Sequence, residues 1–274
     1  MLLIAVPGAL RTFKFLPQKS KNLIVGICLI YALELSLRAD PGPLTLWYST
    51  PGVPGNATSW QQEALPVGNG KLAAMIYGGV GTEQIQFNED TVWGGQPSDY
   101  LNPGATWNWY TNIQAECFNK QSILTDATAH LMSVPIRQAA YQPAGILNLT
   151  FPHSGTLNYK RSLNLSNATV NVHYDYSSVT YDRDIFASAP SNKVIAIRFT
   201  ASQPGKISFS CNFTTLQTAT FNGVVGSDLT MRARVSAIAD SRYYVNGLTN
   251  LVQYVARVRL LNEGGTVTAN GSSV

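Results

Sequence analysis

The fold is decided by the stretch ALPVGNGKLAAMIYGGVG at residues 64–81 and by IQFNEDTVWGGQPSD at residues 85–99. Glycines at positions 68, 70, 78, 79, 81, 94 and 95 punctuate two short apolar runs. Glycine adopts turn conformations that other residues avoid, so the pattern predicts strand, tight turn, strand and then a polar loop. That loop carries Asn88, Glu89, Asp90 and Trp93. An acidic, aromatic loop on a β scaffold suits sugar binding; the alternative is that the glycines make hairpins and the Asn-Glu-Asp cluster caps a turn.

Alternation of apolar and polar residues takes over from Gly145 onward and predicts a series of strands. The alternating runs are 146–151, 169–176, 194–200, 207–213, 229–235 and 254–260. Turn residues separate them, at Ser154-Gly155, Gln203–Gly205, Asn222-Gly223, Asn246-Gly247 and Glu263–Gly265. We therefore expect a mainly β chain, a large antiparallel β-sandwich (a supersandwich). Residues 266–274 begin one more strand, which leaves the expected sandwich incomplete at its C-terminal end with an unpaired edge.

Two other segments depart from the alternation. Residues 41–62 are rich in Pro, Gly, Thr and Ser, and we expect an extended opening segment whose aromatic residues dock on a sheet. Around residues 105–133 apolar residues recur at loosely helical spacing, with a proline following at position 135. This predicts a short helical insertion of one or two helices, and no other helix is expected.

Charge separates a leader from the rest of the chain. The 274 residues carry a net charge of +4 and are 45% hydrophobic, enough for one large β domain. Residues 1–39 hold five basic residues and one acidic residue, which accounts for the whole +4. Residues 40–274 hold 14 basic and 14 acidic side chains, so they lack the clustered positive charge that nucleic acid recognition needs. We expect no nucleic acid partner.

The leader has the pattern of a signal peptide. Lys19 and Lys21 precede an apolar run at 23–33, too short to span a bilayer comfortably, and the small residue Ala39 offers a cleavage site before Asp40. The alternative is a signal anchor that stays uncleaved. We expect a leader at 1–39, a β domain at 40–274, a secreted or extracellular location, and no stable membrane association after cleavage.

Modification signals agree with that compartment. Six sequons mark candidate glycosylation sites at Asn56, Asn148, Asn164, Asn167, Asn212 and Asn270. Cys28 lies in the leader, so Cys117 and Cys211 are the only candidate disulfide, with two buried free thiols as the alternative. No Cys and His spacing resembles a zinc site, and the sequence implies no metal and no cofactor.

Carboxylates and histidines offer little catalytic chemistry. Hydrolysis of a glycosidic bond needs two carboxyl groups roughly 5–10 Å apart. Glu89 and Asp90 are adjacent and would point to opposite faces of a strand. Asp182 and Asp184 would share a face, but with Arg183 between them they suggest a solvated surface pair. The three histidines have no nucleophile and acid arranged as a triad.

The ordered motifs resemble a known family. ALPVGNGKLAAM with FNEDTVWGG, then NPGA at 102–105, YQPAGIL at 141–147, YKRSLNLSNA at 159–168 and YDRDIFASAP at 181–190 are similar to the N-terminal domain of glycoside hydrolase family 95, mainly α-L-fucosidases. The resemblance covers about residues 44–274 and is closest to fungal-type secreted members. It implies that the chain is truncated before a catalytic (α/α)6 barrel, which carries the acid, the base and the assisting asparagines.

This resemblance implies an inverting hydrolase of fucosylated glycans whose N-terminal domain, alone, is inactive. No catalytic residue is then expected in this chain. Asn69, Asn88, Glu89, Asp90 and Trp93 are the candidates for the domain interface or the substrate side. The competing hypotheses are a free-standing carbohydrate-binding module with Trp93, Trp107 and Trp109 as a stacking platform, and a fragment without function that does not fold stably.

Overall fold

The computed structural model of the chain describes residues 44–55, 57–95, 99–119, 122–189, 191, 194–226, 228–236 and 251–274. The leader expected at 1–39, the sequon at Asn56 and the turn expected at Asn246-Gly247 lie outside these residues. Within the described ranges, none of the helices combines the length and the apolar character needed to cross a membrane.

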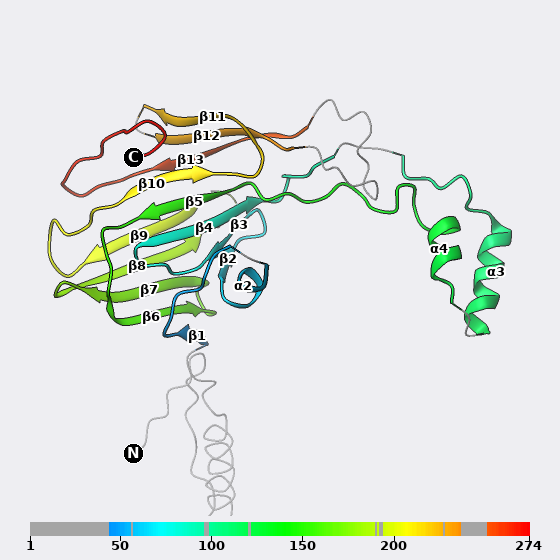
Figure 1. Cartoon of the computed structure of the whole chain (residues 1–274), viewed down its shortest axis with the longest axis horizontal. Coiled ribbons are helices and arrows are strands. Elements are labelled where there is room, and N and C mark those ends of the chain that lie inside the picture. The colour runs from blue at the N-terminus through cyan, green and yellow to red at the C-terminus, as the bar shows by residue number, and fades with distance from the viewer. Residues whose placement is uncertain are drawn as a thin grey trace, which may run out of the picture. The chain divides into compact units, whose positions relative to one another are not determined.

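Antiparallel strands dominate the described chain and form three sheets (Figure 1). The first has the order β1-β6-β7-β8-β9, with β1 Thr45–Tyr48, β6 Leu157–Asn164, β7 Thr169–Tyr176, β8 Val179–Ala187 and β9 Ile195–Ala201. The second has the order β10-β5-β4-β3-β2, with β10 Ser210–Thr214, β5 Gly145–Thr150, β4 Thr82–Glu89, β3 Leu72–Ile76 and β2 Leu65–Gly68. The third contains β11 Thr218–Val225, β12 Asp228–Arg234 and β13 Gln253–Arg259.

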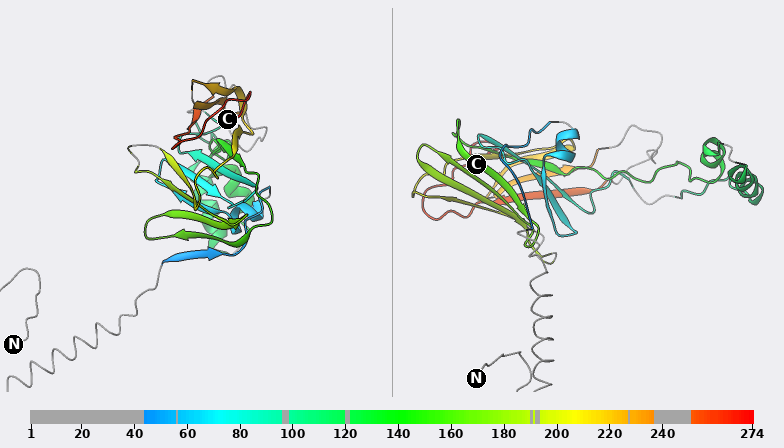
Figure 2. Two further views of the ribbon diagram at one scale, coloured as in Figure 1. Left: turned by 90° about the vertical axis from the view of Figure 1, so that its left-hand side faces the viewer. Right: turned by 90° about the horizontal axis from the view of Figure 1, so that it is seen from below.

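The first two sheets pack face to face around the main core, and Figure 2 shows the layers from two further directions. Strand alternation explains this packing, because every second residue of β7 is buried: Val170, Val172 and Tyr174. Their neighbours on the strand face outward. Leu229 and Met231 of β12 complete the same core, so the third sheet also contributes to it. The expected antiparallel β-sandwich is confirmed.

A buried ion pair joins the two five-stranded sheets. Arg183 of β8 donates from its guanidinium to the carboxylate of Glu83 on β4 at 2.6 Å, and the two side chains are 2% and 0% exposed. Glu83 also accepts backbone N–H bonds from Tyr77 and Gly78, and Arg183 donates to the carbonyl of Gly79. Asp182 and Asp184, expected to form a solvated surface pair, lie on the outer face of β8, whereas Arg183 between them is buried. Residue 183 is one of the positions on β8 that face inward, and the carboxylate opposite makes its burial tolerable.

Two helices occupy the expected insertion. Helix α3 spans Trp107–Phe118, with Thr106 as its N-cap, and α4 spans Leu124–His130. The helices contact each other where the ring of Trp109 stacks on that of His130, with centroids 3.6 Å apart. The helical insertion at 105–133 is confirmed.

Other details differ from the sequence-based expectation. A third helix, α2 at Ala57–Gln62, stands within the segment expected to be extended, and it begins just after Gly55. Asn222-Gly223 lies inside β11 rather than at a turn, because both residues pair with β12, opposite Met231 and Thr230. Residues 266–269 form no strand. Val274 instead exchanges two backbone hydrogen bonds with Cys211 at the free edge of β10.

Candidate functional site

The polar residues singled out in the sequence do gather at one end of the second sheet. Asn69 lies in the β2–β3 hairpin, and Asn88 and Glu89 end β4 opposite Ala73 and Leu72 of β3. The register therefore places the hairpin beside the loop at 90–95. We call the group formed by Asn69, Lys71, Asn88–Asp90, Trp93 and Tyr141 the hairpin-end cluster.

Both asparagines of the hairpin-end cluster hold backbone in place. The Asn69 side-chain oxygen accepts the N–H groups of Lys71 and Leu72, and its amide donates to the carbonyl of Ser188 at 2.7 Å. Gly70, with φ +84°, supplies the left-handed residue that the turn requires. Asn88 donates to the carbonyl of Gln142 at 2.8 Å. These amides fasten loops to one another, which is a structural role.

The two carboxylates of the cluster are engaged locally. Glu89 accepts from the backbone N–H and the hydroxyl of Thr91, so it caps the turn that follows β4. Asp90 forms an ion pair with Lys71, 2.5 Å between carboxylate oxygen and ammonium nitrogen. That pair raises the pKa of Lys71, first through the hydrogen bond and then through the negative charge. The bonding matches the turn-capping alternative for Glu89 and an exposed ion pair for Asp90.

An aromatic pair forms the outer part of the cluster. Trp93 and Tyr141 form an isolated β-bridge, and their rings lie 5.2 Å apart. The indole N–H donates to the carbonyl of Asp90, while the Tyr141 hydroxyl donates to that of Glu89. Both rings remain partly exposed, at 43% and 46%. Tyr141 was missed as a site residue, although it opens the YQPAGIL motif.

The α3–α4 segment, residues 99–136, has the second surface that stands out. Its large exposed side chains are Leu101, Trp107, Tyr110, Phe118, Leu124, Leu131, Met132, Val134 and Ile136. Among the residues of this segment that the structure describes, Ile113 is the one large apolar residue that is buried. The three tryptophans do not form one platform, because Trp93 packs on Tyr141, Trp107 on Tyr110, and Trp109 on His130.

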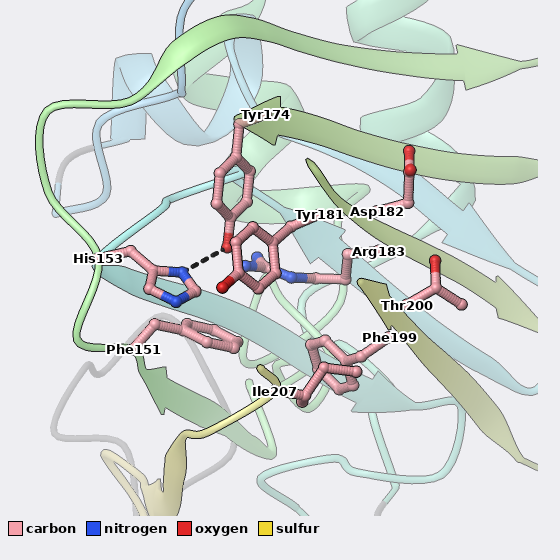
Figure 3. Close-up of a pocket in the computed structure, with 9 residues that line it drawn as sticks. All are labelled: Phe151, His153, Tyr174, Tyr181, Asp182, Arg183, Phe199, Thr200 and Ile207. Carbon is pink, nitrogen blue, oxygen red and sulfur yellow. Dashed lines mark hydrogen bonds between the residues drawn. The ribbon is translucent and has the colours of Figure 1, made fainter. Parts of the chain in front are cut away.

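A small enclosed pocket lies inside the sandwich, beside the Glu83–Arg183 ion pair (Figure 3). His153 lies among aromatic rings there and bonds the hydroxyl of Tyr174 at 3.0 Å. Burial, and secondarily the charge of Arg183, lowers the pKa of His153. The cavity measures about 10 Å³, room for about one water molecule and not for a sugar. This pocket is part of the core.

The candidate disulfide cysteines and the sequon asparagines differ in exposure and in their hydrogen bonds. Cys117 and Cys211 are both free thiols, the first exposed on α3 and the second buried in β10, so the candidate disulfide is not formed. Asn148 and Asn212 pair across β5 and β10, with the Asn148 amide donating to both Asn212 and Thr214. Asn164 and Asn167 lie at the β6–β7 turn, where their side-chain oxygens accept backbone N–H groups. Asn270, near the C-terminal end, is exposed.

In the part of the chain that the structure covers, no group of three or more metal-binding side chains occurs. Asp182 and Asp184 share the outer face of β8, as expected. The amide of Asn171 donates to both, at 3.4 and 2.8 Å, and His173 contacts Asp182 at 2.9 Å. These carboxylates belong to a hydrogen-bonded network on a sheet face rather than to an enclosed site.

Residues 46–274 match the family described as glycosyl hydrolase family 65, N-terminal domain. The chain belongs to this family. "Alpha-L-fucosidase 2" of Arabidopsis thaliana is 35% identical over 164 residues, which are 58% of this chain and 19% of the relative. "Probable alpha-fucosidase A" of Aspergillus niger is 28% identical over 153 residues, 54% of this chain and 19% of the relative.

The glycosyl hydrolase N-terminal domain thus spans about a fifth of the length of these two curated relatives. The sequence motifs resemble family 95 and the matched family carries the number 65; both descriptions denote the N-terminal domain of a glycoside hydrolase. Both relatives are named as fucosidases. The expected membership, an N-terminal domain of a fucosidase-like glycoside hydrolase, is confirmed.

Proposed function

We propose that this N-terminal domain supports an enzyme that hydrolyses α-L-fucosides of fucosylated glycans, and that the catalytic carboxylates belong to a separate helical (α/α)6 domain. The observation that carries this proposal is family membership together with the engagement of the candidate carboxylates: Glu89 in a turn, Asp90 in an ion pair and Asp184 in a network on a sheet face. An acid that donates a proton to a leaving group must lie in a cleft that holds the sugar. The domain by itself is then inactive.

Contact with the catalytic domain is the role that best fits the α3–α4 segment. Large apolar side chains exposed together on a soluble protein mark an interaction surface, because water contact with them is unfavourable. Phe118 and Leu124 are 79% and 72% exposed, at the end of α3 and the start of α4. They would be buried against an apolar surface of the helical domain.

The hairpin-end cluster would supply a second, more polar contact. Trp93 and Tyr141 present two adjacent rings, and Lys71 with Asp90 presents paired charges beside them. Aromatic groups surrounded by polar ones are typical of interface centres. Exchange of Trp93 for alanine should therefore weaken association between domains and leave the fold intact, because its ring is 43% exposed.

Secretion and glycosylation belong to the same proposal. The Asn164 and Asn167 amide nitrogens lie at an exposed turn and are not used by the hydrogen bonds there. By contrast, a glycan on Asn148 would break the amide bonds to Asn212 and Thr214. Peptide mass spectrometry of the chain secreted from a eukaryotic host should find glycans at the β6–β7 turn. Glycans on Asn148 with the 164–169 turn unmodified would contradict this assignment.

An activity assay of the purified chain tests whether the catalytic groups lie outside this domain. A chromogenic α-L-fucoside and a 2-fucosylated oligosaccharide serve as substrates, and the expected result is no turnover above buffer. A Glu89→Gln, Asp90→Asn variant is the matched control for contaminating activity. Turnover that is present in the chain and lost in this variant would show that catalysis occurs here and would refute the proposal.

A further inference from the structure

An open cleft lies at the tip of the first sheet and shares no lining residue with the hairpin-end cluster. It measures about 290 Å³, close to the lower end of the range of small-molecule sites, roughly 300–1,000 Å³. The β7–β8 turn forms one side and the segment before β6 forms the other. Its lining residues are Gly155, Leu157, Asp175, Tyr176, Ser177, Ser178 and Thr180.

Unfavourable backbone conformations concentrate at this cleft. In the described part of the chain four non-glycine residues have left-handed φ, and three of them are Asn158, Ser177 and Ser178, with φ of 53°, 50° and 62°. For each of the two serines this conformation costs of order 1 kcal/mol, whereas asparagine adopts it more readily; strain of this kind clusters at ligand sites. The β7–β8 connection is a two-residue turn, for which Asn-Gly is the favoured pair. Serine is less favourable than Asn or Gly at these two positions, and it places two hydroxyl groups at the mouth of the cleft.

Asp175 is held in a fixed orientation inside the cleft. One carboxylate oxygen accepts from the Thr180 hydroxyl at 2.7 Å, and the other from the Asn158 amide at 2.6 Å. A β-bulge in β6 between Leu157 and Lys160 brings Asn158 into this position. The two hydrogen bonds, first that from Thr180, lower the pKa of Asp175. Each oxygen keeps a second lone pair that can accept a further hydrogen bond.

The other lining residues of the cleft offer two hydroxyl groups, an aromatic ring and an apolar side chain. Among the described residues, neither the Ser177 nor the Ser178 hydroxyl takes part in a hydrogen bond, so both are available to a ligand. The ring of Tyr176 rests on that of His153, with centroids 4.7 Å apart, and so has limited freedom to move. Leu157, 70% exposed, adds apolar surface for the C–H groups of a sugar ring.

Other ligand classes fit less well. Calcium takes six to eight oxygen ligands, usually with several carboxylates, and this cleft offers one. A phosphate or another anion would be repelled by Asp175. A neutral polyol matches, because adjacent hydroxyls can donate to a carboxylate and exchange hydrogen bonds with serines.

We propose that the Asp175 cleft binds a neutral pyranose residue, through hydrogen bonds from adjacent sugar hydroxyls to Asp175 and to Ser177 and Ser178. This site is separate from catalysis, and the proposal does not rest on the function proposed above.

Titration of the ¹⁵N-labelled chain with L-fucose, D-galactose and D-glucose, followed by amide NMR, tests the proposal. The expected result is saturable shifts at residues 175–180 with at least one of these sugars. The double variant Ser177→Asn, Ser178→Gly keeps a favoured two-residue turn and removes both hydroxyls. It should bind at least tenfold more weakly while melting at the same or a higher temperature. Asp175→Asn should also bind at least tenfold more weakly.

Asp126→Asn on α4 is the matched control, since it removes a carboxylate outside the cleft. It should bind like the unchanged chain. The proposal is overturned if no sugar gives saturable shifts, if the shifts lie at Trp93 and Tyr141 instead, or if the double variant binds as well as the original. These outcomes leave the fucosidase assay unaffected, so the two proposals fail separately.

Discussion

Replacement of Arg183 by methionine probes the ion pair that joins the two five-stranded sheets. The guanidinium lies 2.6 Å from the Glu83 carboxylate, and 2% and 0% of the two side chains are exposed. Loss of the guanidinium leaves a buried carboxylate with only the backbone N–H groups of Tyr77, Gly78 and Gly79 as donors among the described residues. Breaking a buried pair in this way costs roughly 3–5 kcal/mol. At roughly 2–4 °C per kcal/mol for a domain of this size, Tm should fall by about 6–20 °C.

A double variant separates the loss of charge pairing from the loss of packing. Adding Glu83→Gln to Arg183→Met removes the uncompensated charge, so the double variant should be more stable than Arg183→Met alone. The pH provides a second check, because burial already raises the pKa of the Glu83 carboxyl. In Arg183→Met that rise should be larger, so a neutral Glu83 is favoured as the pH falls. The stability deficit should then narrow towards acid pH.

Urea denaturation of the full chain, followed by tryptophan fluorescence, measures these differences. A loss below about 1 kcal/mol for Arg183→Met would refute the reasoning, because it would mean that the Glu83 carboxylate is not effectively buried. A double variant that is less stable than Arg183→Met would refute it as well. In that case the packing of the two side chains, and not their charges, would stabilise the contact between the sheets.

Three further results are expected from the same preparation. Gly79→Ala should lower the free energy of unfolding by about 3 kcal/mol in urea denaturation, because its Cβ would lie 1.9 Å from the Thr82 carbonyl oxygen. Gly70→Ala should lower it by about 1 kcal/mol, because only its φ of +84° is unfavourable for alanine. Equal losses in the two variants would contradict this reasoning. Burial lowers the pKa of His153, so the stabilisation that the neutral imidazole provides is present above pH 6.5 and is lost as the pH falls through the lower pKa of the folded state. Between pH 7 and 5, Tm of the chain should therefore fall by more than Tm of His153→Gln. Parallel curves of Tm against pH would show that His153 does not contribute to the pH dependence. In a Cys28→Ser variant, a thiol reagent should modify the exposed Cys117 at once and Cys211 only after unfolding. Burial raises the pKa of Cys211 to about 11, which keeps its thiol protonated and unreactive. Rapid reaction of both cysteines would show that β10 opens easily.

Local patterns were enough to predict much of the fold. Alternation identified β5, β7, β9, β10, β12 and β13 but not β6, β8 or β11. It succeeds where one face of a strand is buried in the core, as Val170 and Val172 of β7 are. The loss of alternation identified the α3–α4 insertion. The glycine-rich motif predicted a strand, a tight turn and a strand, which are β2, the turn at Asn69 and β3. Asn88 and Glu89, expected in the following polar loop, instead end β4.

The features that were missed depend on contacts between distant parts of the chain. The burial of Arg183 was not foreseen, because its partner Glu83 lies 100 residues away in the sequence. Asn222-Gly223 has turn chemistry, but pairing with β12 decides its conformation. Tyr141 joins the hairpin-end cluster through a bridge to Trp93 that no local pattern predicts.

Charge on the α3–α4 segment offers a test of the proposed interface. In a fusion of this domain to the remainder of a relative, Phe118→Asp with Leu124→Asp should reduce activity at least tenfold, because two carboxylates would be desolvated on contact. Both side chains are more than two thirds exposed, so Tm of the domain alone should stay within about 2 °C. Unchanged activity in a folded fusion would place the interface elsewhere.

An exchange of N-terminal domains tests most directly whether this domain supports catalysis carried out by another part of the enzyme. Residues 46–274 would replace the matching segment of Alpha-L-fucosidase 2 from Arabidopsis thaliana, and hydrolysis of a chromogenic α-L-fucoside would be measured. We predict activity in the exchanged enzyme and none in the chain alone. Turnover by the chain alone, or a folded exchanged enzyme without activity, would contradict this role.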